Sequence, residues 1–158
     1  MAEENNQAQK QFGVQRLYTK DVSFETPRSP QVFEEKWAPT IELNLSSNAQ
    51  ALKNDLYEVV LTITVTVKLE NDSTAYLIEA SQAGIFTIKG FSEQEMGPML
   101  GSYCPNFLFP YLREVISDLV IKGSFPPMLL APVNFDALYA QRMQQLQQEK
   151  AAATTNVN

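Results

Sequence analysis

Residues 101–123 read GSYCPNFLFPYLREVISDLVIKG, and this stretch predicts an amphipathic helix. Over residues 108–120 apolar side chains recur every three or four positions, and charged or polar side chains occupy the opposite side. Pro110 fits only the first turn of a helix, and Gly123 is typical of a helix end. We therefore expect a helix over about 109–122 with one face built to be buried.

Aromatic side chains crowd the start of this helix, at Tyr103, Phe107, Phe109 and Tyr111. Four rings are more than one helix of a small domain needs for its own packing. We expect a large apolar partner to cover them, and we take Tyr103 and Phe107 as candidates for a subunit interface.

Alternating side chains predict four β-strands, at 12–24, 41–45, 56–69 and 74–88. The strongest signal is 56–69, which would span roughly 45 Å, far beyond the usual strand length of about 17–20 Å. So long a strand suggests a sheet that continues into another subunit. The turn at 71–73 predicts a hairpin into the next strand, in which Gly84 suggests a bulge or a bend.

The last strand places Leu77 and Glu79 on one face and Tyr76, Ile78 and Ala80 on the other. We expect the latter three to point inward, toward helices or another subunit, and include them among the interface candidates.

The remaining segments give weaker signals. Residues 46–51 have loop composition, and 93–100 is compatible with one short helical turn. A last helix is predicted after Asn134, with Phe135, Leu138, Tyr139, Arg142 and Leu146 on one stripe and an end that frays from Gln147.

Length and composition suit a single domain without a metal or a disulfide. The chain has 158 residues and a mass of 17.8 kDa, enough to bury about 70% of its unfolded surface. We expect one domain over 1–158, with mobile tails at 1–10 and 149–158. The net charge of −6 argues against nucleic acid or an anionic membrane as a partner. No apolar run approaches the roughly 18 residues of a membrane span, so we expect no membrane insertion and a reducing, cytoplasmic location.

The available side chains exclude most enzyme chemistry. The sequence holds one cysteine, Cys104, and no histidine, so the common nucleophile–histidine and histidine–metal sites are absent. It also lacks a glycine-rich phosphate cradle. Carboxylate pairs such as Glu34 and Glu35 are formally able to act as acid and base, although a solvated face is the simpler interpretation. We expect no catalytic residue, metal or cofactor, and keep a small acid–base enzyme as a remote alternative.

Two proline-rich loops carry apolar side chains that would be costly to leave in water. The first loop holds Phe33 and Trp37 between Pro30 and Pro39, and the second holds Phe125, Met128, Leu129 and Leu130. Prolines favour an extended conformation for the first of them. Either these side chains fold onto the sheet as core, or they form the wall of a groove that accepts apolar segments of another chain.

Five blocks of sequence resemble the bacterial SecB family of protein-export chaperones. They occur in the family's order: YTKDVSFETP at 18–27, YEVVL at 57–61, GIF at 84–86, YCPNFLFPY followed by RE at 103–114, and LAPVNFDAL at 130–138. Together the blocks extend over about residues 12–140.

The resemblance implies an α+β chain with a four-stranded antiparallel sheet and two helices, assembled as a dimer of dimers. It also implies an ATP-independent holdase that binds unfolded preproteins in apolar grooves and delivers them to the SecA translocase ATPase. We expect the preprotein clients to lie over Phe33, Trp37, Ile41, Leu43, Tyr57, Phe125, Met128, Leu129 and Leu130.

The family's contact with the zinc-bearing C-terminal segment of SecA maps onto Asp21, Glu25, Leu77 and Glu79. The sequence departs from the family pattern at Ala83, where glycine is common, at Leu112, where alanine is usual, and in a tail without an acidic run. An oligomeric acidic adaptor of an unrelated pathway remains the alternative within the binding class.

Overall fold

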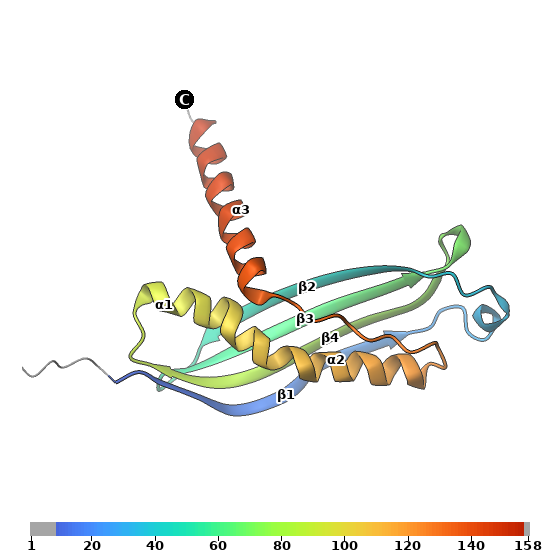
Figure 1. The fold of residues 1–158 in the computed structure, drawn as a ribbon, viewed down its shortest axis with the longest axis horizontal. Helices are drawn as coiled ribbons and strands as arrows, with labels where there is room; N and C mark the ends of the chain where they lie inside the picture. Colours follow the sequence, from blue (N-terminus) through green and yellow to red (C-terminus); the bar gives the residue numbers. More distant parts are fainter. Residues whose placement is uncertain (1–8, 157–158) are drawn as a thin grey trace, which may run out of the picture.

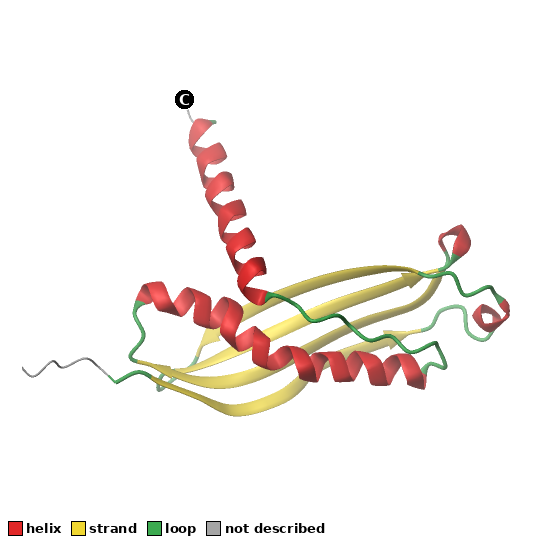
Figure 2. Ribbon diagram, viewed as in Figure 1, coloured by secondary structure: helices red, strands yellow, loops and turns green. Residues whose placement is uncertain are grey.

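The computed structural model describes residues 9–156, which form an antiparallel sheet with the strand order β1-β4-β3-β2 (Figure 1). The strands are β1 (Gln11–Glu25), β2 (Thr40–Ala51), β3 (Leu56–Lys68) and β4 (Thr74–Lys89). A long kinked helix lies across one face of the sheet, and a second helix projects away from it (Figure 2). The α+β fold with four antiparallel strands and two helices is therefore confirmed.

The helix that lies on the sheet is longer than the sequence predicts. It begins with α1 (Glu93–Pro98), continues through a π-helical segment (Met99–Tyr103) and ends with α2 (Cys104–Lys122). Pro110 therefore lies inside a helix rather than in its first turn. Proline has no N–H, so the carbonyl of Asn106, four positions earlier, loses its helical hydrogen bond. Asn106 and Pro110 are both exposed, so water can donate to that carbonyl instead.

The start of α1 is set by a reciprocal cap. The backbone N–H of Glu95 donates to Ser92 Oγ at 3.3 Å, and the backbone N–H of Ser92 donates to Glu95 Oε2 at 2.9 Å. Lys10 forms an ion pair with the same carboxylate at 2.5 Å, so the chain just before β1 is tied to α1.

The second helix, α3 (Phe135–Thr155), begins as expected at Asn134, whose side chain accepts from the N–H of Ala137 at 3.0 Å. It does not fray at Gln147 but continues to Thr155. Of the tails expected at 1–10 and 149–158, residues 1–8 and 157–158 lie outside the described part of the chain.

Two expectations about the strands are wrong. Residues 46–51 are not a loop, because they pair with residues 57–62 of β3 and complete the long edge strand β2. Gly84 is not a bulge, because it keeps register with Leu17 and Val59. A Cβ at Gly84 would lie 2.7 Å from the ring of Phe86 and 3.1 Å from Leu108, so this glycine serves close packing under α2. The register shifts lie elsewhere: two are in the pairing of β1 with β4, and one is at the end of β3, between Val67 and Lys68.

The core lies between α2 and the sheet. It contains Leu108, Leu112 and Ile116 of α2 and the inward side chains of β3 and β4. Tyr76, Ile78 and Ala80 point inward as expected, with exposures of 1%, 0% and 0%. Because they have almost no surface within one chain, they cannot contact a second chain directly, and their assignment to a subunit interface is corrected.

The loop between β1 and β2 contains one turn of 3-10 helix (Gln31–Glu34) rather than a fully extended crossover. It follows a cis Ser29–Pro30 bond. The loop of residues 124–133 is irregular, as expected, and runs back along α2 over the sheet to the start of α3 (Figure 1).

Candidate functional site

The helix face of the sheet is only partly covered. Four strands about 4.8 Å apart form a face almost 20 Å wide, whereas one helix with its side chains covers about 10–12 Å. The helix α2 lies over the central strands β4 and β3 and barely touches the edge strand β1. Apolar side chains on both edge strands therefore stay accessible on this face.

Phe125 joins the two apolar loops. Its ring centroid lies 5.6 Å from that of Phe33, 5.8 Å from that of Trp37 and 4.7 Å from that of Tyr76. Phe125 itself is only 5% exposed. The buried ring of Phe125 therefore links the loop of residues 124–133 to the crossover and to the sheet. Some side chains of the two loops belong to the core, whereas others stay exposed.

The expected groove residues divide by exposure. Phe125 and Leu130 are each 5% exposed and belong to the core, so their assignment to the groove is wrong. Phe33 and Leu129, in contrast, are 51% and 80% exposed. Trp37 and Met128 are half-buried beside them.

Ile41 and Leu43 extend this exposed surface along β2. They pair with Val67 and Val65, two buried residues of β3, so their side chains point to the helix face. Because β2 is an edge strand that no helix covers at this point, they are 46% and 54% exposed. We call Phe33, Trp37, Ile41, Leu43 and Leu129 the open groove.

Tyr57 does not join the open groove. It lies near the start of β3 and pairs with Ala51 and Phe86, whereas the open groove lies near Val67, ten residues further along the strand. That separation is roughly 33 Å at 3.3 Å per residue. The expectation that Tyr57 lies in the groove with Ile41 and Leu43 is therefore wrong.

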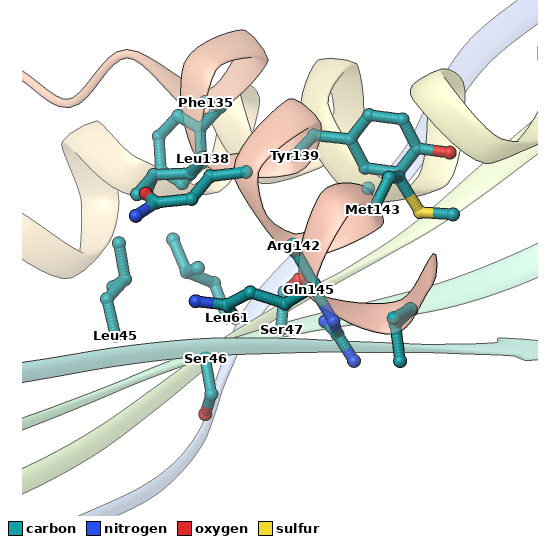
Figure 3. Close-up of a pocket in the computed structure, with 13 residues that line it drawn as sticks. Leu45, Ser46, Ser47, Leu61, Phe135, Leu138, Tyr139, Arg142, Met143 and Gln145 are labelled. Atoms are coloured by element: carbon teal, nitrogen blue, oxygen red, sulfur yellow. The ribbon is translucent and has the colours of Figure 1, made fainter. Parts of the chain in front are cut away.

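A pocket between β2 and α3 lies next to this surface (Figure 3). It has a volume of about 640 Å³ and includes Leu45 and Leu61 on the sheet and Leu138, Arg142 and Leu146 on α3. The sequence predicted the stripe on α3 that forms one wall, but only the structure shows that α3 faces β2.

The residues expected to contact SecA come together on the opposite face of the sheet. β1 and β4 are neighbours, with Glu25 opposite Leu77 and Ser23 opposite Glu79. Asp21, two positions from Ser23, shares the face of Glu79. The three carboxylates are exposed and Leu77 is half-buried. We call these four residues the acidic corner. They lie on one face of two neighbouring strands, and their binding of SecA stays a prediction.

The aromatic side chains at the helix start form a cluster with β1. The ring centroid of Phe12 lies 4.9 Å from that of Tyr103 and 5.7 Å from that of Phe107. Tyr103 is still 47% exposed, and Tyr111, eight residues further along the chain, is 49% exposed. Val14 and Val22 on the uncovered side of β1 are each 39% exposed. We call these exposed residues and Phe107 the β1–α2 strip.

The described residues offer little for catalysis. Burial raises the pKa of the Cys104 thiol to about 12, so this cysteine is not an activated nucleophile. Within residues 9–156 no group of three or more candidate ligand side chains is placed to hold a metal ion. In the same residues, no helix has the length and hydropathy that crossing a membrane requires.

The comparisons with known proteins agree with the resemblance. Residues 5–146 match the family described as preprotein translocase subunit SecB. The chain is 65% identical over 154 residues to the protein-export protein SecB of Methylococcus capsulatus, covering 98% of this chain and 99% of that one. It is 57% identical over 146 residues to the SecB of Nitrosococcus oceani, covering 91% and 88%.

A solved structure shows the same fold at low identity. It is the Mycobacterium tuberculosis Rv1957 SecB-like chaperone in complex with a ChAD peptide from the Rv1956 HigA1 antitoxin, with a TM-score of 0.66 and 16% identity. The match covers 77% of this chain and 90% of that chain. The chain therefore belongs to the SecB family, whose members are cytoplasmic, non-enzymatic chaperones of protein export.

Proposed function

We propose that this chain holds unfolded secretory preproteins on the open groove, without ATP, and passes them to SecA. The observation that carries the proposal is the set of exposed apolar side chains on the helix face, above all Leu129 at 80% exposure. Covering apolar surface gains about 25 cal/mol per Å², so affinity depends on the length and hydrophobicity of the client. The direct test is nucleotide-free binding of a preprotein in its unfolded and folded forms.

A groove of this kind favours unfolded chains for a geometric reason. The groove residues lie along an edge strand and two loops, so an extended segment can cover several of them at once. A folded protein has buried most of its own apolar side chains, so few of them are exposed to contact such a surface. The pocket beside α3 provides a further apolar recess along the same edge strand.

For the transfer step, we propose that the acidic corner binds the zinc-bearing C-terminal segment of SecA. A basic peptide would find three carboxylates around one leucine, with the charges steering the encounter and Leu77 giving contact area. The acidic corner and the open groove lie on opposite faces of the sheet. A client and SecA could then bind the same chain together.

Charge reversal in the acidic corner gives the test of this step. Asp21→Lys and Glu79→Lys are each expected to raise the Kd of the SecA C-terminal peptide at least about tenfold at low salt, because a favourable charge becomes a repulsive one. Titration calorimetry measures the effect. Wild-type binding should itself weaken as salt rises toward 1 M, where the Debye length is about 3 Å.

Glu149→Lys is the matched control, because it makes the same charge change on an exposed residue of α3. It should leave peptide binding unchanged, and all three variants should retain client binding. Wild-type affinity in both Asp21→Lys and Glu79→Lys would remove the acidic corner from the mechanism.

We further propose that the chain assembles as a homotetramer, a dimer of dimers, through surfaces that include the β1–α2 strip. The support is the apolar character of that strip, with Tyr103, Tyr111, Val14 and Val22 between 39% and 49% exposed. Several large apolar side chains exposed on neighbouring elements of a single chain are typical of an interface.

A further inference from the structure

Met128 presents its sulfur atom to a buried tyrosine hydroxyl. Tyr76 Oη donates to Met128 Sδ across 3.8 Å. Tyr76 is only 1% exposed, and the rings of Phe24 and Phe125 lie beside it. Because a thioether is a weak acceptor, the buried hydroxyl has a poorer partner here than water would provide.

The backbone of Met128 is fixed while its side chain stays within reach of solvent. Ser117 Oγ donates to the carbonyl oxygen of Met128 at 3.2 Å, which ties the loop to α2. Met128 itself is only half-buried, on the loop of residues 124–133. Met128 as a residue is therefore partly accessible to a small oxidant in the folded chain.

We propose that Met128 is a site of oxidation by hydrogen peroxide, at which the sulfoxide oxygen accepts the hydrogen bond of the Tyr76 hydroxyl. The sulfur lone pair attacks one peroxide oxygen and the O–O bond breaks; the oxygen now bound to sulfur gives its proton to the departing oxygen, which leaves as water. The sulfur is oxidised by two electrons and the peroxide is reduced by two, so no further reactant is needed.

The distance between Tyr76 Oη and Met128 Sδ suits a hydrogen bond to an oxygen atom added on the sulfur. An O–H···O bond of about 2.7 Å, bent at the sulfoxide oxygen, together with one sulfur–oxygen bond spans the 3.8 Å between Tyr76 Oη and Met128 Sδ. Burial also raises the pKa of Tyr76, so the phenol keeps its proton and remains a donor at neutral pH. A sulfoxide oxygen is a far stronger acceptor than the thioether that it replaces.

This geometry predicts an unusual response to oxidation. A methionine sulfoxide in apolar surroundings normally destabilises a protein because a polar group is buried without a partner. At Met128 the partner is already in place, so part of that cost is offset.

The test is a thermodynamic cycle with hydrogen peroxide on the full chain. Wild type and Tyr76→Phe are unfolded in urea before and after oxidation, and peptide mass mapping follows each methionine. Oxidation should raise the unfolding equilibrium constant in both proteins, by a factor about fivefold smaller in wild type than in Tyr76→Phe, which corresponds to one hydrogen bond. Cys104 is buried with a raised pKa, so it should react slowly with peroxide.

Met128→Leu is the matched control, since it removes the sulfur but keeps an apolar side chain of similar size. Its stability should change less on oxidation than that of Tyr76→Phe, because only exposed Met143 and the half-buried Met96 and Met99 then contribute within the described chain. An equal cost of oxidation in wild type and Tyr76→Phe would overturn the proposal. So would an unmodified Met128 after Met143 has been converted.

Discussion

Replacing Leu43 and Leu129 together by serine is expected to weaken capture of an unfolded preprotein tenfold to about a hundredfold. Fully covering one leucine side chain is worth about 1.5 kcal/mol or more, and each 1.4 kcal/mol corresponds to about a factor of ten in Kd. Both side chains are more than half exposed, so the free energy of unfolding should stay nearly unchanged. Fluorescence titration with an unfolded client measures the first quantity and urea unfolding the second.

Two neighbouring residues supply the controls for that experiment. Leu130→Ser changes a leucine that is only 5% exposed, so it should lower the free energy of unfolding by about 3 kcal/mol or more. Asn44→Ser changes a side chain of β2 on the other face of the sheet and should affect neither quantity. If Leu43→Ser/Leu129→Ser binds clients as wild type does, the open groove is not where clients bind.

Introducing lysine at Val22 and Tyr111 is expected to dissociate the assembled protein. In the tetramer that we propose, the β1–α2 strip is covered, so the wild type should sediment near 71 kDa, four times the 17.8 kDa chain. Two unpaired charges in an apolar contact cost several kcal/mol, so Val22→Lys/Tyr111→Lys should sediment at half that mass or less. Sedimentation velocity at micromolar concentration is the measurement.

Ile41→Lys is the control for the assembly experiment, because it places the same charge on an equally exposed apolar residue of the other edge strand. It should leave the sedimentation coefficient unchanged. A mass of 71 kDa for Val22→Lys/Tyr111→Lys would show that the subunits meet elsewhere, and a wild-type monomer would contradict the tetramer itself.

Most of the sheet was predictable from the sequence because its central strands obey simple periodicity. In β3 every second side chain is buried, as the alternation of Val, Ile and Leu with Thr predicts. The second half of β2 was missed, because 46–51 is polar and finds its place only by pairing with β3. The short helical turn expected at 93–100 is present as α1, but its continuation into α2 was missed, since Gly97, Pro98 and Pro110 are poor helix formers that packing overrides.

The candidate sites differ in how far the sequence could predict them. The acidic corner depends on strand register, and the period of two correctly placed Leu77 and Glu79 on one face. The open groove includes proline-rich loops that have no periodicity, so nothing local distinguishes buried Leu130 from exposed Leu129. That difference arises only when the loop folds back over the sheet.

The capture of unfolded chains is best tested by titrating this protein with one preprotein in its unfolded and folded forms. In titration calorimetry without nucleotide, we expect the unfolded preprotein to bind with a negative heat-capacity change, because apolar surface is covered. We expect no binding of the folded mature form. Equal affinity for the two forms, or a requirement for ATP, would show that this chain is not an ATP-independent holdase.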